Sequence, residues 1–66
     1  MTRPPFHILR VEENENVFVD DRSWYHDACL LADIACTETR IHHVVWDSRR
    51  KIVLYDSRLI ANKLNM

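Results

Sequence analysis

The residues of this sequence that are most able to bind a metal are four histidines and two cysteines. Their spacing matches none of the common zinc patterns CxxC, HxxxH or HExxH. His42 and His43 are adjacent on an expected strand, so their side chains should point to opposite faces. His26 and Cys29 lie on the boundary between two faces of an expected helix. We therefore expect neither a metal site nor a cofactor.

Nucleophilic catalysis would need an exposed cysteine, or a serine within reach of a base. Cys29 and Cys36 fall on the expected buried side of the helix among acidic neighbours. Ser48 and Ser57 each follow an aspartate in sequence, a pattern that is typical of turns and caps and not of a catalytic triad. The chain has no glycine, so it has no glycine-rich loop for a phosphate. We expect that the protein is not an enzyme.

The cysteines also indicate a compartment. On one helix Cys29 and Cys36 would lie roughly 10 Å apart, beyond the roughly 7 Å Cα separation that a disulfide can span. Free thiols are typical of the reducing cytosol. No stretch approaches the length of a membrane span, and the N-terminal residues lack the apolar segment of a signal peptide. We expect a cytoplasmic protein without membrane contact.

Periodic apolar residues predict four strands, at residues 6–11, 16–20, 41–46 and 51–55. A helix should run from about Arg22 to Glu38, with Asp20, Asp21 or Ser23 as its N-cap. Residues 1–66 are then a single α+β domain, a small antiparallel sheet in ββαββ order with one helix packed across one face. The tail after Ser57 could open a short C-terminal helix.

The expected helix turns mostly small residues toward the sheet, among them Ala28 and Ala32. Leu30 and Ile34, four residues apart, fall instead on its polar side, where such a pair forms an apolar patch. This patch indicates a contact with another protein, unless the helical phase differs from the expected one or the C-terminal tail covers the pair. A chain of 66 residues has a marginal core, which also favours association with a partner or with a second copy.

An aromatic residue followed by Asp-Ser-Arg occurs twice, at residues 46–49 and 55–58. In a chain without glycine, Asp and Ser end strands and form turns, and we interpret both Asp-Ser pairs in this way. The aromatic residues are harder to explain. A tight hairpin would place Trp46 and Tyr55 on the face of the sheet away from the helix, together with Val44 and Val53. A sheet covered by one helix should be polar there, so this face lacks a cover unless the tail folds over it.

Nucleic-acid binding is the main alternative to protein binding. Arg49, Arg50 and Lys51 cluster at the expected hairpin tip, and Trp46 and Tyr55 could stack on unpaired bases. The net charge of −1 and the pI of about 6.4 are far from those of a basic nucleic-acid-binding domain.

The sequence thus favours a small non-enzymatic module that binds a protein partner, or a second copy as a homodimer. The expected contact residues are Leu30, Ile34, Trp46 and Tyr55, with Arg49, Arg50 and Arg58 as a charged rim. In size and architecture alone, the chain resembles bacteriophage host-takeover and anti-defence proteins. That resemblance implies a viral inhibitor or regulator that occludes a surface of its partner, and it assigns no individual residue.

Overall fold

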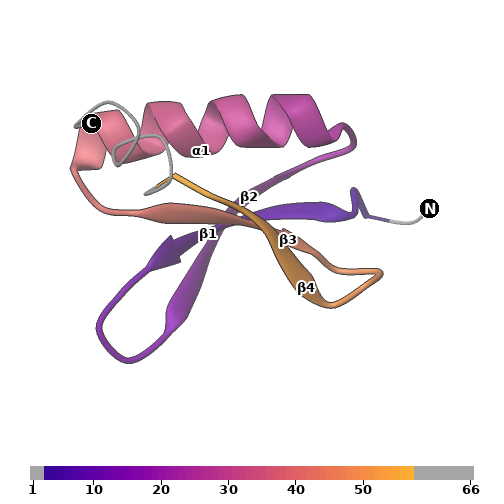
Figure 1. Cartoon of the computed structure of the whole chain (residues 1–66), viewed down its shortest axis with the longest axis horizontal. Coiled ribbons are helices and arrows are strands. Elements are labelled where there is room, and N and C mark those ends of the chain that lie inside the picture. Colours follow the sequence, from indigo (N-terminus) through magenta and orange to yellow (C-terminus); the bar gives the residue numbers. More distant parts are fainter. Residues whose placement is uncertain (1–2, 58–66) are drawn as a thin grey trace.

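Two antiparallel hairpins joined by a helix make up the fold, which the computed structural model describes for residues 3–57 (Figure 1). In chain order the elements are β1 (Phe6–Val11), β2 (Asn16–Arg22), α1 (Tyr25–Thr39), β3 (His43–Asp47) and β4 (Ile52–Asp56). The strands form one sheet in the order β2-β1-β3-β4. The predicted α+β class and ββαββ order are confirmed. The expected C-terminal helix lies outside the described residues.

The core is formed where α1 crosses the two central strands. Ile8 of β1 is paired with Val45 of β3, and both side chains are fully buried. Ala28 and Ala32 of α1 are also fully buried and pack against this pair. Because alanine side chains are short, the helix lies close to the sheet, as its composition predicted. In Figure 1 the helix runs over one face only, so the other face has no second layer among residues 3–57.

The helix begins later than predicted. Strand β2 continues to Arg22, and Trp24 occupies the N-cap position without a side-chain hydrogen bond. The predicted caps Asp20 and Asp21 are instead part of β2. The Asp21 amide donates to Asp20 Oδ1 (2.8 Å), and the Arg22 guanidinium pairs with Asp20 Oδ2 (2.8 Å). These contacts hold the pKa of Asp20 below its ordinary value, first through the backbone amide and then through Arg22.

Both Asp-Ser pairs have the structural role that was predicted. Asp47 Oδ1 accepts hydrogen bonds from the amides of Arg49 and Arg50 and so holds the β3–β4 turn. Ser48 donates to the Pro5 carbonyl through its amide (2.9 Å) and its hydroxyl (3.0 Å). Ser57 follows β4 and is bonded to the backbone of His43 through its own amide and its hydroxyl. The repeated motif therefore closes one turn and ends one strand.

Among residues 3–57, the backbone adopts a positive φ at Arg40 (60°) and Lys51 (59°). Arg40 ends α1, and its amide donates to the Cys36 carbonyl at 2.8 Å. Lys51 is the last residue of the β3–β4 turn, and its amide donates to the Asp47 carbonyl at 2.7 Å. Left-handed backbone is unfavourable for residues with a Cβ atom. A chain without glycine therefore carries this strain at two basic residues.

The strain at the end of α1 can be relieved. We expect Arg40→Gly to raise the free energy of unfolding by about 1 kcal/mol, because glycine adopts positive φ without a steric cost. Thr37→Gly, an exposed control inside the same helix, should lower it by about 0.4 kcal/mol, the difference in helix propensity between the two residues. Urea denaturation followed by circular dichroism measures both changes. Equal losses in the two variants would contradict this account of Arg40.

Candidate functional site

The uncovered side of the sheet carries a cluster of apolar residues around His7, and the two rows that form it end in Asp21 and Asp56. Phe18, Leu9 and Val44 are cross-strand neighbours in one row, and His7, Trp46 and Val53 are neighbours in the next. The helix packs on the opposite side, against Ile8 and Val45. We call these six residues of the uncovered side the open face: His7, Leu9, Phe18, Val44, Trp46 and Val53.

The edges of the open face are exposed, whereas its middle is not. Phe18 is 46% exposed and Val53 is 49% exposed, while Val44 is buried and Trp46 is half-buried. The Phe18 ring contacts the His7 ring edge to face (5.4 Å between centroids), and the Arg3 guanidinium lies 5.5 Å from the Phe18 centroid. The sequence alone did not indicate Phe18, because its row is formed by β1, β2 and β3, whose pairing no local pattern specifies.

Tyr55 does not share a face with Trp46, so that prediction is wrong. The β3–β4 register shifts between Val45 and Trp46, and this irregularity pairs Tyr55 with Val45 on the helix side. A tight hairpin without a shift was the basis of the prediction. One extra residue in a strand moves all following side chains to the opposite face.

Tyr55 instead connects the sheet to the helix. Its hydroxyl donates to Asp33 Oδ1 at 2.8 Å, and Tyr25 donates to the Leu54 carbonyl at 3.4 Å close by. Burial raises the pKa of Tyr55, and the hydrogen bond to Asp33 raises it further. Burial also raises the pKa of the Cys29 thiol, which packs against the core. A thiol with a raised pKa is a poor nucleophile.

The apolar pair on the helix lies on the outer side of α1, as predicted. Leu30 is 49% exposed and Ile34 is 52% exposed. A shallow hollow of about 270 Å³ beside Ile34 is lined also by Asp33, Thr37 and Glu38. This pair and the open face lie on opposite sides of the molecule, because the helix and the core separate them.

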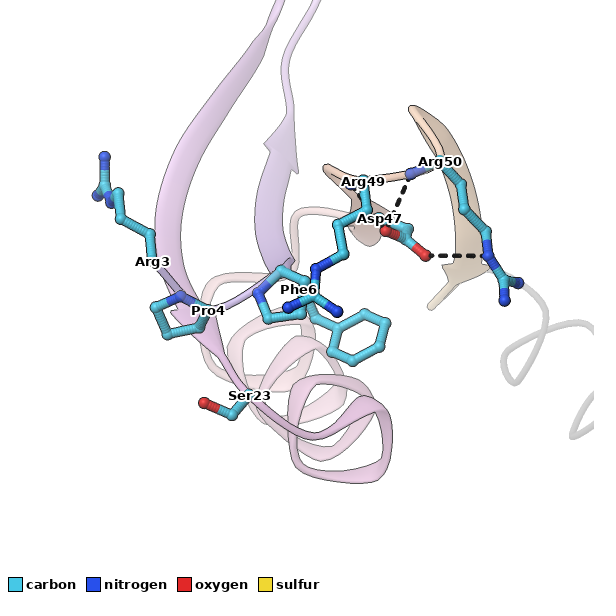
Figure 2. A pocket seen from close by; sticks show the side chains of 8 residues that line it. Arg3, Pro4, Phe6, Ser23, Asp47, Arg49 and Arg50 are labelled. Atoms are coloured by element: carbon cyan, nitrogen blue, oxygen red, sulfur yellow. Dashed lines mark hydrogen bonds and ion pairs between the residues drawn. The ribbon is translucent and has the colours of Figure 1, made fainter. Parts of the chain in front are cut away.

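The basic residues gather at one end of the sheet. Arg49 and Arg50 of the β3–β4 turn line a cavity of about 350 Å³, together with Arg3 and its neighbours in the N-terminal segment and Ser23 before α1 (Figure 2). No local pattern in the sequence indicated Arg3, which lies 46 and 47 positions before these two arginines. The hydrogen bond between Pro5 and Ser48 holds its segment beside the turn. Arg58, also expected in this cluster, lies outside the described residues.

The opposite end of the sheet is acidic. Glu12, Glu13 and Glu15 occupy the connection between β1 and β2, which projects away from the β3–β4 turn in Figure 1. These glutamates and the arginines of the β3–β4 turn thus lie at opposite ends of the sheet, although Asp21 and Asp47 lie at the basic end. The positive charge of the basic end would attract a partner that carries carboxylates or phosphates on its own surface.

Within residues 3–57 no three His, Cys, Asp or Glu side chains come close enough together to hold a metal ion. His43 is buried, and its Nδ1 is bonded to the Ile41 carbonyl at 2.7 Å. The helix of this part of the chain is not long and apolar enough to cross a membrane.

No protein-family model, curated protein or solved structure matches the chain.

The bond between Tyr55 and Asp33 yields a test of stability and its pH dependence. Tyr55→Phe should lower the free energy of unfolding at pH 7 by about 1–2 kcal/mol, because it leaves a partly buried carboxylate without its donor. A raised folded pKa means that this stabilisation is complete below the ordinary tyrosine pKa of about 10 and is lost as the pH rises above it. Urea denaturation should therefore show that the free energy of unfolding falls more between pH 7 and pH 11 in the native protein than in the variant.

Tyr25→Phe is the matched control, because it removes a longer bond at a more exposed hydroxyl. It should lower the free energy of unfolding at pH 7 by less than Tyr55→Phe does. An equal decrease in the two variants would mean that the bond to Asp33 has no special role in joining β4 to α1.

Proposed function

We propose that this protein is a non-enzymatic module that binds another protein through the open face of its sheet. The supporting observation is the row of apolar side chains on a face that no described element covers. An antiparallel sheet with one helix normally alternates apolar residues toward the helix with polar residues toward water. Here the residues opposite the helix are also apolar, including Leu9, Trp46 and Val53.

The kinds of side chain on the open face are those that contribute most to protein interfaces. Aromatic residues are enriched at the centre of interfaces, because they bury a large area with few rotatable bonds. Complete burial of the exposed parts of Phe18 and Val53 would contribute on the order of 1 kcal/mol each. Trp46, already half-buried, is held in place before any partner arrives, so little side-chain entropy is lost when it is covered.

The surroundings of the open face supply its polar rim. Arg3 pairs with Asp21 at 3.7 Å and lies over Phe18 at its edge. Arg49 and Arg50 lie beyond the end of this face, in the β3–β4 turn, and the cavity that they line contains Phe6 and Asp47 of the helix side. Rim charges of this kind raise the rate of association and select the partner more than they raise affinity. The activity that fits such a surface is occlusion, in which the module blocks a site of its partner as an inhibitor or regulator of the viral host-takeover kind would.

Nucleic-acid binding is the competing function, and two observations weigh against it. The turn of Tyr55 toward Asp33 removes one of the two stacking rings that this function would use. A carboxylate also lies among the basic residues, since Asp47 accepts hydrogen bonds from the amides of Arg49 and Arg50 and its Oδ2 lies 3.8 Å from Arg50 Nε. Phosphate-driven binding would weaken steeply with added salt, whereas apolar contact would not.

Neighbouring residues of β4 test the open face with a matched pair of variants. Val53 is 49% exposed on the open face, and Ile52 is 46% exposed on the helix side. We expect Val53→Thr to weaken partner binding about tenfold, because a hydroxyl replaces a methyl group in an apolar contact. Ile52→Thr should change it less than twofold, about 0.4 kcal/mol. The tagged protein and both variants are used to capture partners from a host-cell lysate, with mass spectrometry as the readout.

The same capture includes nuclease treatment and two salt concentrations. A protein partner that persists under all conditions and is lost with Val53→Thr supports the proposal. Partners that disappear with nuclease and high salt would overturn it in favour of nucleic acid. Trp46→Ala, the larger change at the centre of the face, is interpreted only if circular dichroism shows a folded variant.

The pair Leu30 and Ile34 is proposed as a second contact, either for the same complex or for self-association. Leu30→Asp should weaken capture or convert a homodimer to a monomer, because it places a charge within an apolar contact. His26→Asp adds the same charge at an exposed position one turn earlier in α1 and should change neither. Sedimentation velocity measures self-association directly. Unchanged capture and unchanged sedimentation for Leu30→Asp would show that this patch is an ordinary solvated surface.

A further inference from the structure

We propose that two adjoining cavities at the basic end of the sheet bind an acidic side chain of a peptide together with its large apolar neighbour. This inference rests on the proposed function and specifies the chemistry of the partner. The first cavity, of about 350 Å³, includes Arg49 and Arg50 in its lining. The second, of about 360 Å³, is lined by Phe6, Tyr25, Leu54, Asp47 and Arg50. Phe6, Asp47 and Arg50 line both cavities, so the two are contiguous.

The first cavity holds one cation that the described chain does not neutralise. Arg50 Nε lies 3.8 Å from Asp47 Oδ2, and Arg3 Nε lies 3.7 Å from Asp21 Oδ2. The Arg49 guanidinium has neither an ion pair nor a hydrogen bond with any residue between 3 and 57. In Figure 2 the Arg49 side chain extends toward Phe6, whereas that of Arg3 points away from these residues. Arg49 is therefore the group that an anion would meet, and its planar donors suit a carboxylate.

The second cavity is apolar and suits a side chain, not a charge. The rings of Phe6 and Tyr25 meet at 5.8 Å in an edge-on arrangement, and Leu54 faces the same space. Leu54 is the residue at which the β3–β4 register shifts, so it is available to line a cavity and is not paired across the strands. Leucine, phenylalanine or methionine next to an acidic residue would fill this space while the carboxylate contacts Arg49.

The charges between the cavities favour a short acidic peptide over a polyanion. Asp47 is 8% exposed, lines both cavities and is held by Arg50 and by two backbone amides. A phosphodiester chain that passes from one cavity to the other would meet this carboxylate. A peptide avoids that repulsion, because only one of its two adjacent side chains is charged. Asp47 also repels an acidic group from the second cavity and thus fixes the orientation of the peptide.

The experiment is an NMR titration of the isotopically labelled full chain with synthetic peptides. The probe is a blocked hexapeptide of alternating glutamate and leucine. Two control peptides replace glutamate by glutamine or leucine by serine, and an oligothymidylate serves as a polyanion. We expect the probe peptide of glutamate and leucine to shift the amide signals of Phe6, Arg49, Arg50 and Leu54. Each control peptide should bind about tenfold more weakly, the effect of losing one charge-assisted hydrogen bond or one buried side chain.

Two variants complete the design. Arg49→Gln removes the unpaired guanidinium from an exposed side chain and should weaken binding of the acidic peptide about tenfold. Lys51→Asn removes the same charge from the same turn, does not line either cavity, and places a residue that tolerates positive φ at that position. It should change binding less than twofold, about 0.4 kcal/mol.

Three results would overturn the inference. The glutamine peptide could bind as tightly as the glutamate peptide, or Arg49→Gln and Lys51→Asn could weaken binding equally. The oligothymidylate could also bind the same residues more tightly than the glutamate peptide does. Since this titration uses no cellular partner, it can fail while Val53→Thr still weakens partner capture. In that case the open face would remain the binding surface, and the cavities would have no part in it.

Discussion

The close contact between one helix and two central strands is the constraint on which the rest of this structure depends. Ala28 and Ala32 lie directly on Ile8 and Val45, and these four are the fully buried residues at the centre of the core. So small a contact removes little apolar area from water, and few other residues reinforce it. Hydrogen bonds that join distant parts of the chain supplement it, chiefly the one from Tyr55 to Asp33 between β4 and α1. The fold therefore combines a minimal core with a few polar connections, as expected of a chain near the lower size limit for independent folding.

A single helix cannot cover both sides of a four-stranded sheet, and this shortage explains the surfaces proposed for binding. The face under α1 is buried by alanines, whereas the open face keeps Phe18, Trp46 and Val53 without a second layer among the described residues. A larger domain would bury such side chains under another helix. Here a partner can take the place of that layer, so that the stability of the module and its recognition depend on the same residues. Variants of Trp46 are accordingly expected to report on both properties, whereas those of Val53 report mainly on recognition.

Charge is distributed along the sheet by its topology. The connection between β1 and β2 carries glutamates at one end, and the β3–β4 turn carries arginines at the other. Asp47 organises the basic end, because its carboxylate holds the turn and at the same time pairs with Arg50. Asp47 therefore forms the turn and also determines which of the two arginines it pairs with. Within residues 3–57 the Arg49 guanidinium has no partner, because Asp47 contacts the backbone amide of this residue and not its side chain.

The sequence by itself determined the class of the fold, the order of its elements, the role of the two Asp-Ser pairs in closing one turn and ending one strand, and the outward position of Leu30 and Ile34. These features depend on local hydrogen bonds and on periodicity, which neighbouring residues specify. Only the tertiary structure decided the face of Tyr55, because one irregularity in the β3–β4 register reverses the side chains that follow it. It also decided the start of α1, since pairing with β1 extends β2 through the residues that would otherwise cap the helix. The cavities at the basic end depend on contacts between segments more than 40 residues apart, such as Ser48 with Pro5 (43 residues), and no local pattern encodes those contacts.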